Sequence, residues 1–276
     1  MDQSPTGLFL NQQKYVLDLL EEANMMHCKP AKTPLPTNFK DETSGIQLEN
    51  ASEYQRLVGK LIYLTITRPD IAYAVSFVSQ FMHSPSSHHL QLVKRIIRYL
   101  KSSISTGIFM QNNGHFTIEG YTDSDWAGNV LDRKSTTGYC TLVGGNLVTW
   151  KSKKQFVVAR SSAEAEYRAM ASTACELIWL KRLLRDLEII SSKPILLHCD
   201  NQAVMHIAAN PVFHERTKHI EVDCHFVRNQ VQSKLLQTVF VRSSDQLADV
   251  FTKLLPSAQL DRLLFKLGSR RTLDPA

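Results

Sequence analysis

The chain has 276 residues, of which 43% are hydrophobic and 21% charged, a composition typical of a globular protein with a buried core. The net charge of +6 is consistent with a polyanionic partner. The five cysteines are dispersed, which favours a reducing compartment over a disulfide framework, and no apolar run approaches the roughly 20 residues of a membrane helix. We therefore expect an intracellular, soluble protein with no membrane partner and no secretory signal.

Helical periodicity dominates the first hundred residues, where apolar residues recur at the three- and four-residue spacing of a helix face. The stretch 28–45 contains three prolines and many polar residues, which indicates an extended linker or loop. We expect a mainly helical first domain over 1–110, with helices at about 9–23, 54–66, 71–82 and 87–101.

The pattern changes after Ser103. Residues 115–123 alternate between polar and apolar, and 136–153 are typical of a β-hairpin that turns at Gly144 and Gly145. Strands and helices then alternate, which predicts a mixed α/β domain over 111–256, followed by a C-terminal helix and tail over 257–276. Its later elements are a helix at 162–188, a strand at 195–200, a helix from Asn201, a helical segment at 214–233, a strand at 235–242 and a capped helix at 243–255.

Two carboxylates stand one residue apart in the stretch YTDSDWAG, residues 121–128. Asp, Ser and Gly favour turns, so a turn is sufficient to explain this stretch by itself. Asp123, however, ends the first strand of this domain and Asp200 ends the fourth, and the carboxyl ends of neighbouring strands in an open α/β sheet meet at one crevice. If these strands are neighbours, both carboxylates lie within reach of one metal ion. Asp125 then shapes the turn or assists from the rim.

The long predicted helix offers two glutamates that point to different sides. Glu164 stands three residues after Ser161, the spacing of a capping box, which gives it a structural role. Glu166 lies on the stripe of Met170 and Thr173 that is expected to face the sheet. A buried carboxylate needs a partner because an unpaired buried charge is costly. Glu166 is therefore the predicted metal ligand of this helix.

Asp249 completes the acidic set, one turn inside the last predicted helix. A solvated helix charge would explain it when taken alone. Together, Asp123, Glu166, Asp200 and Asp249 predict a site, because clustered carboxylates repel one another unless a cation is present, and oxygen ligands select Mg²⁺ or Mn²⁺. Two such ions, about 3.5–4 Å apart, would clamp the attacking and leaving oxygens of a phosphodiester.

These residues stand in motifs that resemble the ribonuclease H domain of copia-type LTR retrotransposon Pol polyproteins. The motifs are, in family order, GYTDSDWAG, RKSTTGYC, SSAEAEYRA, CDNQAV, RTKHIEVDCHFVR and DQLADVFTK. The earlier segment is similar to the thumb and connection region of the same family's reverse transcriptase, in the stretches LFLNQQKYVLDLL, CKPAKTPLP, LVGKLIYLTITRPDIAYAV and RIIRYLK. The resemblance covers almost the whole chain.

The resemblance implies a ribonuclease H-like α/β fold, with a mixed five-stranded sheet and flanking helices, preceded by a mainly helical segment. It implies an endoribonuclease that cuts the RNA strand of an RNA–DNA hybrid with two metal ions, and it assigns the acidic set to Asp123, Glu166, Asp200 and Asp249. The polymerase's own aspartate motif does not occur in this sequence, so we expect no DNA synthesis from it alone. The remainder of the reverse transcriptase is an expected partner, in a cytoplasmic virus-like particle or the nucleus.

Weaker signals concern one histidine and two groups of cations. His219 is a candidate for moving protons or easing product release, and a surface or capping role explains it equally well. The neighbouring His214, Cys224 and His225 fit no structural zinc spacing. Phosphate contacts are expected from six basic residues, for which solvated faces are the alternative: Lys94, Arg98, Lys101, Lys151, Lys153 and Lys154.

Two other functions are compatible with these patterns. A non-catalytic nucleic-acid-binding remnant would keep the fold and lose the reaction, although the intact acidic set favours the enzyme. A resolvase of the same fold would share the carboxylates, but the extended resemblance on both sides of the nuclease motifs argues against it.

Overall fold

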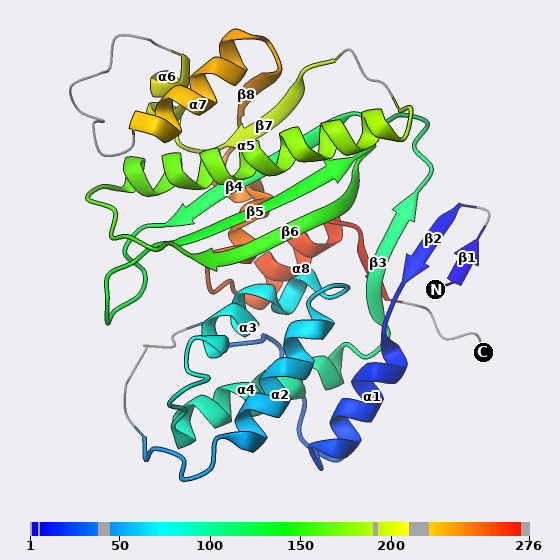
Figure 1. Cartoon of the computed structure of the whole chain (residues 1–276). Coiled ribbons are helices and arrows are strands. Elements are labelled where there is room, and N and C mark those ends of the chain that lie inside the picture. Colours follow the sequence, from blue (N-terminus) through cyan, green and yellow to red (C-terminus); the bar gives the residue numbers. More distant parts are fainter. Residues whose placement is uncertain (1, 5, 38–44, 190–192, 210–220, 272–276) are drawn as a thin grey trace. The chain divides into compact units, whose positions relative to one another are not determined.

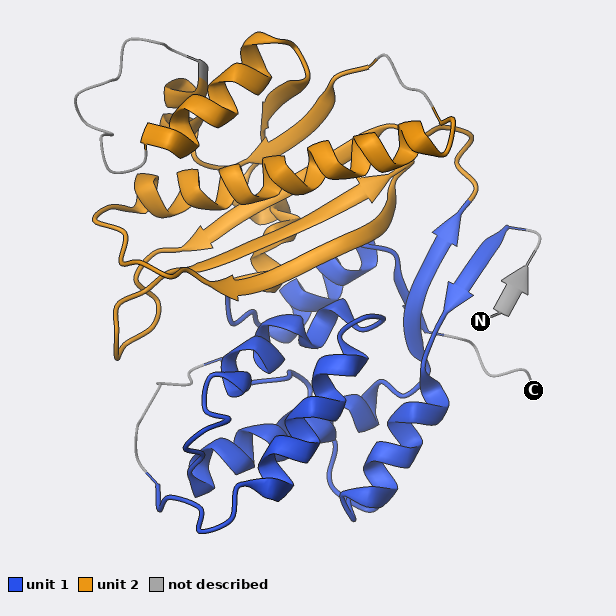
Figure 2. Ribbon diagram, viewed as in Figure 1, with its two compact units in different colours: residues 1–111, 253–276 blue, residues 112–252 orange. Residues whose placement is uncertain are grey.

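The computed structural model describes residues 2–4, 6–37, 45–189, 193–209 and 221–271. Its contacts divide the chain into two compact units (Figure 2). Unit 1 comprises Met1–Gln111 and Lys253–Ala276, and unit 2 comprises Asn112–Thr252. The sequence predicted three segments, 1–110, 111–256 and 257–276. The contacts give two units, because they group the C-terminal segment with the N-terminal one.

Unit 1 is built on a helical core, as the periodicity predicted. Its helices are α1 (Gln13–Glu22), α2 (Ser52–Leu64), the 3₁₀ turn η1 (Pro69–Ile71), α3 (Ala72–Ser79), α4 (Ser87–Ser102) and α8 (Ser257–Lys266). Buried leucine, isoleucine and valine side chains from α1 to α4 form one continuous cluster. Ser86 caps α4: its hydroxyl accepts a hydrogen bond from the backbone N–H of His89, and the His89 ring accepts one in return.

Unit 1 also contains a four-stranded antiparallel sheet that the periodicity did not predict. Its strands are β1 (Asp2–Ser4), β2 (Gly7–Leu10), β3 (Thr106–Gln111) and β9 (Ser269–Arg271), in the order β1-β2-β3-β9. Three to six residues are too few to show a clear alternation. The expected helix start near residue 9 was therefore wrong, since residues 7–10 pair with β3.

A buried ion pair fastens the middle of unit 1. The Arg68 side chain is only 1% exposed and donates hydrogen bonds to Asp70 at 2.7 and 3.0 Å. Its remaining N–H groups reach the backbone oxygen and hydroxyl of Ser103, at 2.9 and 2.6 Å. Tyr99 donates its hydroxyl to the same carboxylate at 2.8 Å, and burial and then Asp70 hold the pKa of Tyr99 well above its usual value. Every partner is needed because the charges are out of contact with water.

Unit 2 contains the mixed five-stranded sheet that was predicted. Its strands are β4 (Ile118–Asp125), β5 (Thr136–Val143), β6 (Asn146–Lys154), β7 (Ile195–Cys199) and β8 (Leu236–Phe240). Their order is β6-β5-β4-β7-β8 (Figure 1). The first three are antiparallel, whereas β7 is parallel to both β4 and β8. The hairpin turns at Gly144 and Gly145 as expected, where φ is +58° and +76°.

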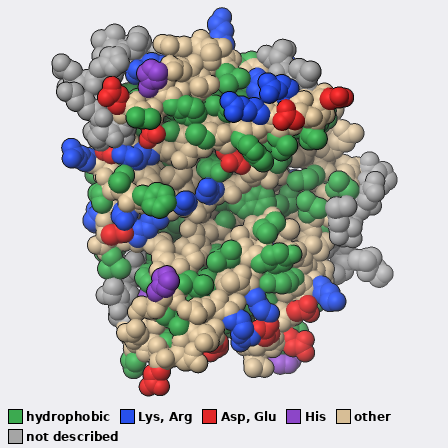
Figure 3. All heavy atoms as spheres, in the orientation of Figure 1, with side chains coloured by type: hydrophobic (Ala, Val, Ile, Leu, Met, Phe, Trp, Pro, Cys, Tyr) green, Lys and Arg blue, Asp and Glu red, His purple; other side chains and the backbone are tan. Residues whose placement is uncertain are grey.

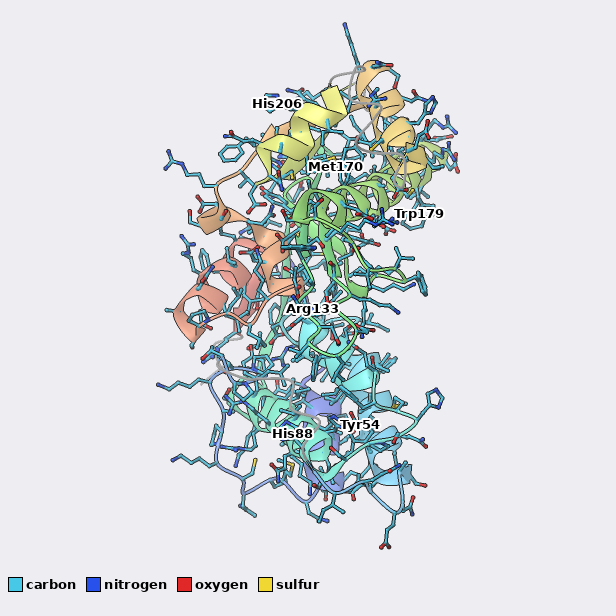
Figure 4. All side chains as sticks on the ribbon, turned by 90° about the vertical axis from the view of Figure 1, so that its left-hand side faces the viewer. Tyr54, His88, Arg133, Met170, Trp179 and His206 are labelled. Atoms are coloured by element: carbon cyan, nitrogen blue, oxygen red, sulfur yellow. The ribbon has the colours of Figure 1, made fainter. Side chains whose placement is uncertain are left out.

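Helix α5 (Ser162–Asp186) covers one face of this sheet, with α6 (Gln202–Ala209) and α7 (Glu221–Gln232) beside it (Figure 1). Its inner side is buried at Met170, whereas Trp179 lies on the outer side and is 52% exposed (Figure 4). Thr173 donates its hydroxyl to that of Thr122 on β4 at 2.9 Å. Among the described helices of both units, none is long and apolar enough to cross a membrane.

Gly120 allows α5 to lie close to β4. A Cβ atom at this position would come within 2.7 Å of Leu177 Cδ1, whose side chain is fully buried. We expect Gly120→Val to lower the free energy of unfolding by about 1–3 kcal/mol through overpacking. Urea denaturation would measure this change. Gly59→Ala in α2 is the control, because a Cβ there meets nothing within 4 Å, and we expect it to stabilise the protein. If the Gly120→Val and wild-type proteins are equally stable, α5 can move away from β4 to make room for the valine.

Candidate active site

Asp123 and Asp200 lie at the same end of two adjacent parallel strands. Tyr121 on β4 is paired with His198 on β7, so continuing the register by two residues sets Asp123 beside Asp200. The condition stated for a shared metal site, that these strands be neighbours, is therefore met. Asp123 is 1% exposed, and Asp200 is partly exposed at the point where β7 leads into α6.

A hydroxyl group holds one oxygen of each carboxylate. Thr252 donates to Asp123 Oδ2, and Ser243 donates to Asp200 Oδ2 at 2.8 Å. These bonds fix the rotation of both carboxylates. Thr252 can approach because Asp123 is paired with Gly138 on β5, where a Cβ atom would lie 2.4 Å from Thr252 Cγ2. The glycine of GYC in the hairpin thus makes room for the segment that holds Asp123.

Glu166 reaches Asp200 from α5. Oxygen atoms of these two carboxylates and Cys199 Sγ all lie within 4.8 Å of one another. Glu166 precedes Thr173 by about two helical turns, so it lies beyond the point where α5 contacts β4 and near the strand ends. Its side chain is buried, being 7% exposed. Two acids from different elements therefore meet at one point, which is the arrangement expected of shared cation ligands.

Cys199 belongs to this group by position but not by chemistry. Its thiol is buried, and burial above all, then the nearby carboxylates, raises its pKa to about 12. The thiol therefore remains protonated at neutral pH, and a neutral sulfur is a poor ligand for Mg²⁺. Asp123 is among the carboxylates that act on Cys199, together with Glu166 and Asp200.

Glu164 has a structural role at the start of α5, although its carboxylate bonds to Arg160, the residue before the predicted cap Ser161. Its backbone N–H donates to the Ser161 hydroxyl at 3.2 Å, and its carboxylate accepts from the Arg160 backbone N–H at 2.8 Å. It also forms an ion pair with Arg168 at 3.0 Å. These contacts fix the start of α5 and thereby the position of Glu166, two residues further on.

Asp249 lies in a segment whose shape was predicted wrongly. Residues 243–255 were expected to form one capped helix, but they form two 3₁₀ turns, η3 (Ser243–Asp245) and η4 (Leu247–Phe251). The break falls at the buried Gln246, whose side chain donates to Thr122 O at 3.0 Å and accepts from Ala248 N at 3.2 Å. Asp249 is itself buried, being 4% exposed, so the solvated helix charge is excluded.

Among the described residues, the ligand group within 4.8 Å contains Glu166 and Asp200 but neither Asp123 nor Asp249. Asp123 is aligned with Asp200 by the strand register, and Asp249 stands on the segment that holds Asp123 through Thr252. Their roles as metal ligands stay a prediction. His219, together with His214, lies outside the described residues, so its proposed part in proton transfer also stays a prediction.

Asp125 is the last residue of β4, directly before the turn at Trp126. Its carboxylate lies directly above Gly128, where a Cβ atom would overlap both carboxylate oxygens at 2.0 Å. Trp126 is 52% exposed, and its indole N–H donates to Ala159 O at 3.1 Å. This bond ties the turn to the connection that leads into α5. Both predicted roles of Asp125, shaping the turn and assisting from the rim, stay predictions.

A groove of about 570 Å³, here called the cationic groove, lies in unit 2 between β5–β6, α5 and α7, and its lining includes one acid, Asp223. Lys and Arg side chains gather there, where β6 ends and α5 begins (Figure 3). The lining includes three of the predicted phosphate-binding residues, Lys151, Lys153 and Lys154, and also Arg168. Lys154 pairs with Asp132 at 2.8 Å, and Lys153 lies 4.7 Å from the ring centre of Phe156, which is 81% exposed.

Two of the three cations predicted in unit 1 have partners within that unit. Arg98 donates to the backbone oxygen of Lys29 at 2.6 Å, and Lys101 donates to that of Cys28 at 2.7 Å. Both bonds fasten the proline-rich segment to α4, whereas Lys94 is exposed. The proposed phosphate contacts of these three residues stay a prediction.

Sequence reasoning missed several residues that shape the site. Thr252, Ser243 and Gln246 hold the carboxylates or their segment, and Arg168 joins the cationic groove. The spacing of Arg168 four residues after Glu164 was a usable signal of an ion pair. The other three depend on contacts between distant parts of the chain and leave no local pattern.

Comparisons with known proteins give close relatives by sequence. The chain is 47% identical over 268 residues to a retrovirus-related Pol polyprotein from transposon RE1 of Arabidopsis thaliana, covering 97% of this chain and 18% of the relative. It is 39% identical over 264 residues to the Pol polyprotein from transposon TNT 1-94 of Nicotiana tabacum, covering 92% and 20%. An uncharacterised mitochondrial protein of Arabidopsis thaliana is 46% identical, and the match covers 63% of this chain and 73% of that protein. No protein-family model matches.

Solved structures give fainter likenesses. An LC11 ribonuclease H1 in complex with an RNA/DNA hybrid matches 54% of this chain and 99% of its own, at 14% identity and a TM-score of 0.37. A foamy viral protease-reverse transcriptase in complex with an RNA/DNA hybrid matches 78% of this chain and 27% of its own, at 11% identity and a TM-score of 0.42. The chain spans about a fifth of the length of the Pol polyproteins, at 18% and 20%.

Proposed function

We propose that unit 2 is a ribonuclease H-type endonuclease, because the chain belongs to the retrovirus-related Pol polyproteins of transposons. Its motifs resemble those of the copia-type elements. Its substrate is the RNA strand of an RNA–DNA hybrid, which it hydrolyses as part of a longer Pol polyprotein. Its place of action is the cytoplasmic virus-like particle or the nucleus. The observation that carries the proposal is the convergence of Glu166 with Asp200, beside Asp123, at the strand ends.

The donor set fits divalent cations that prefer oxygen. Glu166 and Asp200 place carboxylate oxygens within 4.8 Å of each other in a partly buried setting, where like charges repel. The Cys199 thiol stays protonated, so the ligand atoms that the site offers to a cation are carboxylate oxygens. Asp123, Glu166, Asp200 and Asp249 would hold the cations, with Mg²⁺ or Mn²⁺ the ions that such a set selects.

Two divalent cations, when bound, would activate the attacking water and stabilise the charge on the leaving oxygen of the phosphodiester. The chain's own groups provide the geometry. The hydroxyls of Thr252 and Ser243 hold Asp123 and Asp200 in fixed rotations, and the capped start of α5 fixes Glu166. The products carry a 3′-hydroxyl on one RNA fragment and a 5′-phosphate on the other. The 2′-hydroxyl groups mark the RNA strand as the one to be cut.

The cationic groove is suited to the phosphates of the hybrid. Lys151 and Lys153 are exposed on β6, the edge strand of the sheet, and Arg168 is two residues from Glu166 on α5. Contacts of this kind supply affinity without sequence preference, as an enzyme that removes a whole RNA strand requires. The exposed ring of Phe156 offers an apolar surface beside them.

The direct test is cleavage of a hybrid with a labelled RNA strand by the purified chain with Mg²⁺, and separately with Mn²⁺. We expect cutting of the RNA strand and no cutting of the DNA strand or of a DNA duplex. Binding of the hybrid without cleavage under either ion would instead support the non-catalytic remnant.

The groove predicts the salt dependence of binding. We expect the double variant Lys151→Ala, Lys153→Ala to bind the hybrid about tenfold more weakly near 0.1 M salt, with the slope of log affinity against log salt reduced by about two. Fluorescence anisotropy at several salt concentrations would measure both. Lys234→Ala is the matched control, because Lys234 is exposed in the turn before β8. An unchanged slope in the double variant would remove these lysines from the binding surface.

A further inference from the structure

Three polar side chains form a cluster on the sheet face opposite α5. Gly120 and Thr122 contact α5, so Glu119, Tyr121 and Asp123 point to the other face. His198 stacks on Tyr121, with ring centres 4.3 Å apart and planes inclined by 11°. Its Nε2 lies 3.0 Å from Glu119 Oε2. The cluster therefore joins β4 to β7 on the face to which Asp123 belongs.

The cluster lies where the pairing of the two strands ends. Only three residue pairs are in register between β4 and β7: Glu119 with Leu196, Gly120 with Leu197, and Tyr121 with His198. Asp123 and Asp200 follow the last of these pairs by two residues each. The spacing of the two acids therefore depends on how firmly the last pair, Tyr121 and His198, is held.

We propose that Glu119, Tyr121 and His198 are positioning residues that set the spacing between Asp123 and Asp200 for metal binding. This inference rests on the proposed function of the same site. The hydrogen bond links His198 back to Glu119 at the first registered pair, and the ring stack links it to Tyr121 at the last. Together they fix β7 against β4 both along and across the strands.

The packing supports this role over a purely surface one. The His198 side chain is 13% exposed and that of Glu119 is 27% exposed, so the bond between them is largely shielded from water and is stronger than an exposed pair. Loss of a group bonded directly to a metal ligand commonly lowers metal affinity by about 10- to 100-fold, and this cluster acts one step further out, through the strands that carry the ligands.

The test measures metal binding and cleavage in the same set of variants. We expect His198→Ala to raise the Mg²⁺ concentration for half-maximal cleavage by about tenfold and to weaken Mg²⁺ binding in calorimetry equally. The KM for the hybrid should stay within about twofold of the wild-type value, because the cationic groove lies on the α5 face of the sheet and the cluster lies on the other face. Glu119→Ala should have the same effect, whereas Glu119→Gln, which keeps an acceptor for His198, should restore most of the affinity.

Thr149→Val is the matched control for a general loosening of the sheet. Thr149 and Thr141 share a hydrogen bond of 2.7 Å between β6 and β5, so this variant also breaks a cross-strand contact, but one that does not join β4 to β7. It should leave the Mg²⁺ requirement unchanged. By contrast, Tyr121→Leu, which removes the ring stack on His198, should raise the Mg²⁺ requirement.

The outcomes separate this inference from the proposed function. A wild type that cleaves, with variants of unchanged Mg²⁺ requirement, would overturn the positioning role and leave the nuclease intact. A wild type that binds Mg²⁺ without cleaving, with binding weakened in His198→Ala, would support the positioning role and reject the nuclease. If the wild type binds no divalent ion, both are rejected.

Discussion

Replacement of Asp200 by asparagine is expected to lower the rate of RNA-strand cleavage by at least about a thousandfold, which corresponds to about 4 kcal/mol of transition-state stabilisation. The loss is large because Asp200 shares its position with Glu166 and is held by Ser243, so no neighbouring group can take its place without moving a strand end. Asp123→Asn should have an effect of the same size. Single-turnover cleavage of the labelled hybrid, with Mg²⁺ and with Mn²⁺, would measure it.

The same substitution should not destabilise the fold. Asparagine keeps an acceptor for Ser243 and removes one charge from a cluster of like charges, so in the absence of metal the melting temperature should stay equal or rise. With Mg²⁺ present, the wild type should gain stability and Asp200→Asn should gain less. Asp186→Asn is the control for charge alone, since Asp186 is exposed near the end of α5. A variant that cleaves at the wild-type rate would show that the acidic cluster is not the site.

The largest effect on stability is expected from Asp70→Ala in unit 1. This change leaves the Arg68 guanidinium buried without its carboxylate, and such losses cost about 3–5 kcal/mol. Tyr99 loses the acceptor of its hydroxyl at the same time. Chemical denaturation followed by circular dichroism would measure the change.

A second variant distinguishes a buried charge from a simple cavity. In Arg68→Met, Asp70→Ala both charges are absent, so we expect part of the lost stability to return. Replacing Glu22, which pairs with Arg56 and Lys60 near the surface, should cost about 1 kcal/mol or less. If Asp70→Ala costs no more than the Glu22 variant, the ion pair does not carry the stability of this unit.

Local signals in the sequence were sufficient for most of unit 2. The paired glycines within residues 136–153 predicted the hairpin, because positive φ at Gly144 and Gly145 is a local requirement of the turn. Ser161 and Glu164 predicted the start of α5, whereas burial does not distinguish Glu166 from Glu164, because both side chains are buried. Each depends on neighbours within a few residues, which a sequence displays directly.

The unpredicted features depend on partners far apart in the chain. The sheet of unit 1 pairs Leu10 with Ile108 and Ile108 with Ser269, in strands too short to be recognised alone. The expected helix at 243–255 is broken because Gln246 bonds to Thr122 O, across 124 positions. In such cases a tertiary contact outweighs the local preference, which is weak for a segment of one or two turns.

The sequence by itself determined the mixed α/β type of unit 2 and the order of its elements, because periodicity and turn residues are local properties. The four candidate acids came from their positions on these elements, and the nuclease type came from the resemblance of the motifs to a known family. Only the tertiary structure decided that β4 and β7 are neighbours, that Thr252 and Ser243 hold the carboxylates, and that Arg98 and Lys101 bind the chain's own backbone. The physical reason is that hydrogen bonds and charge contacts act over a few ångströms in space, whatever the separation of the two groups in sequence.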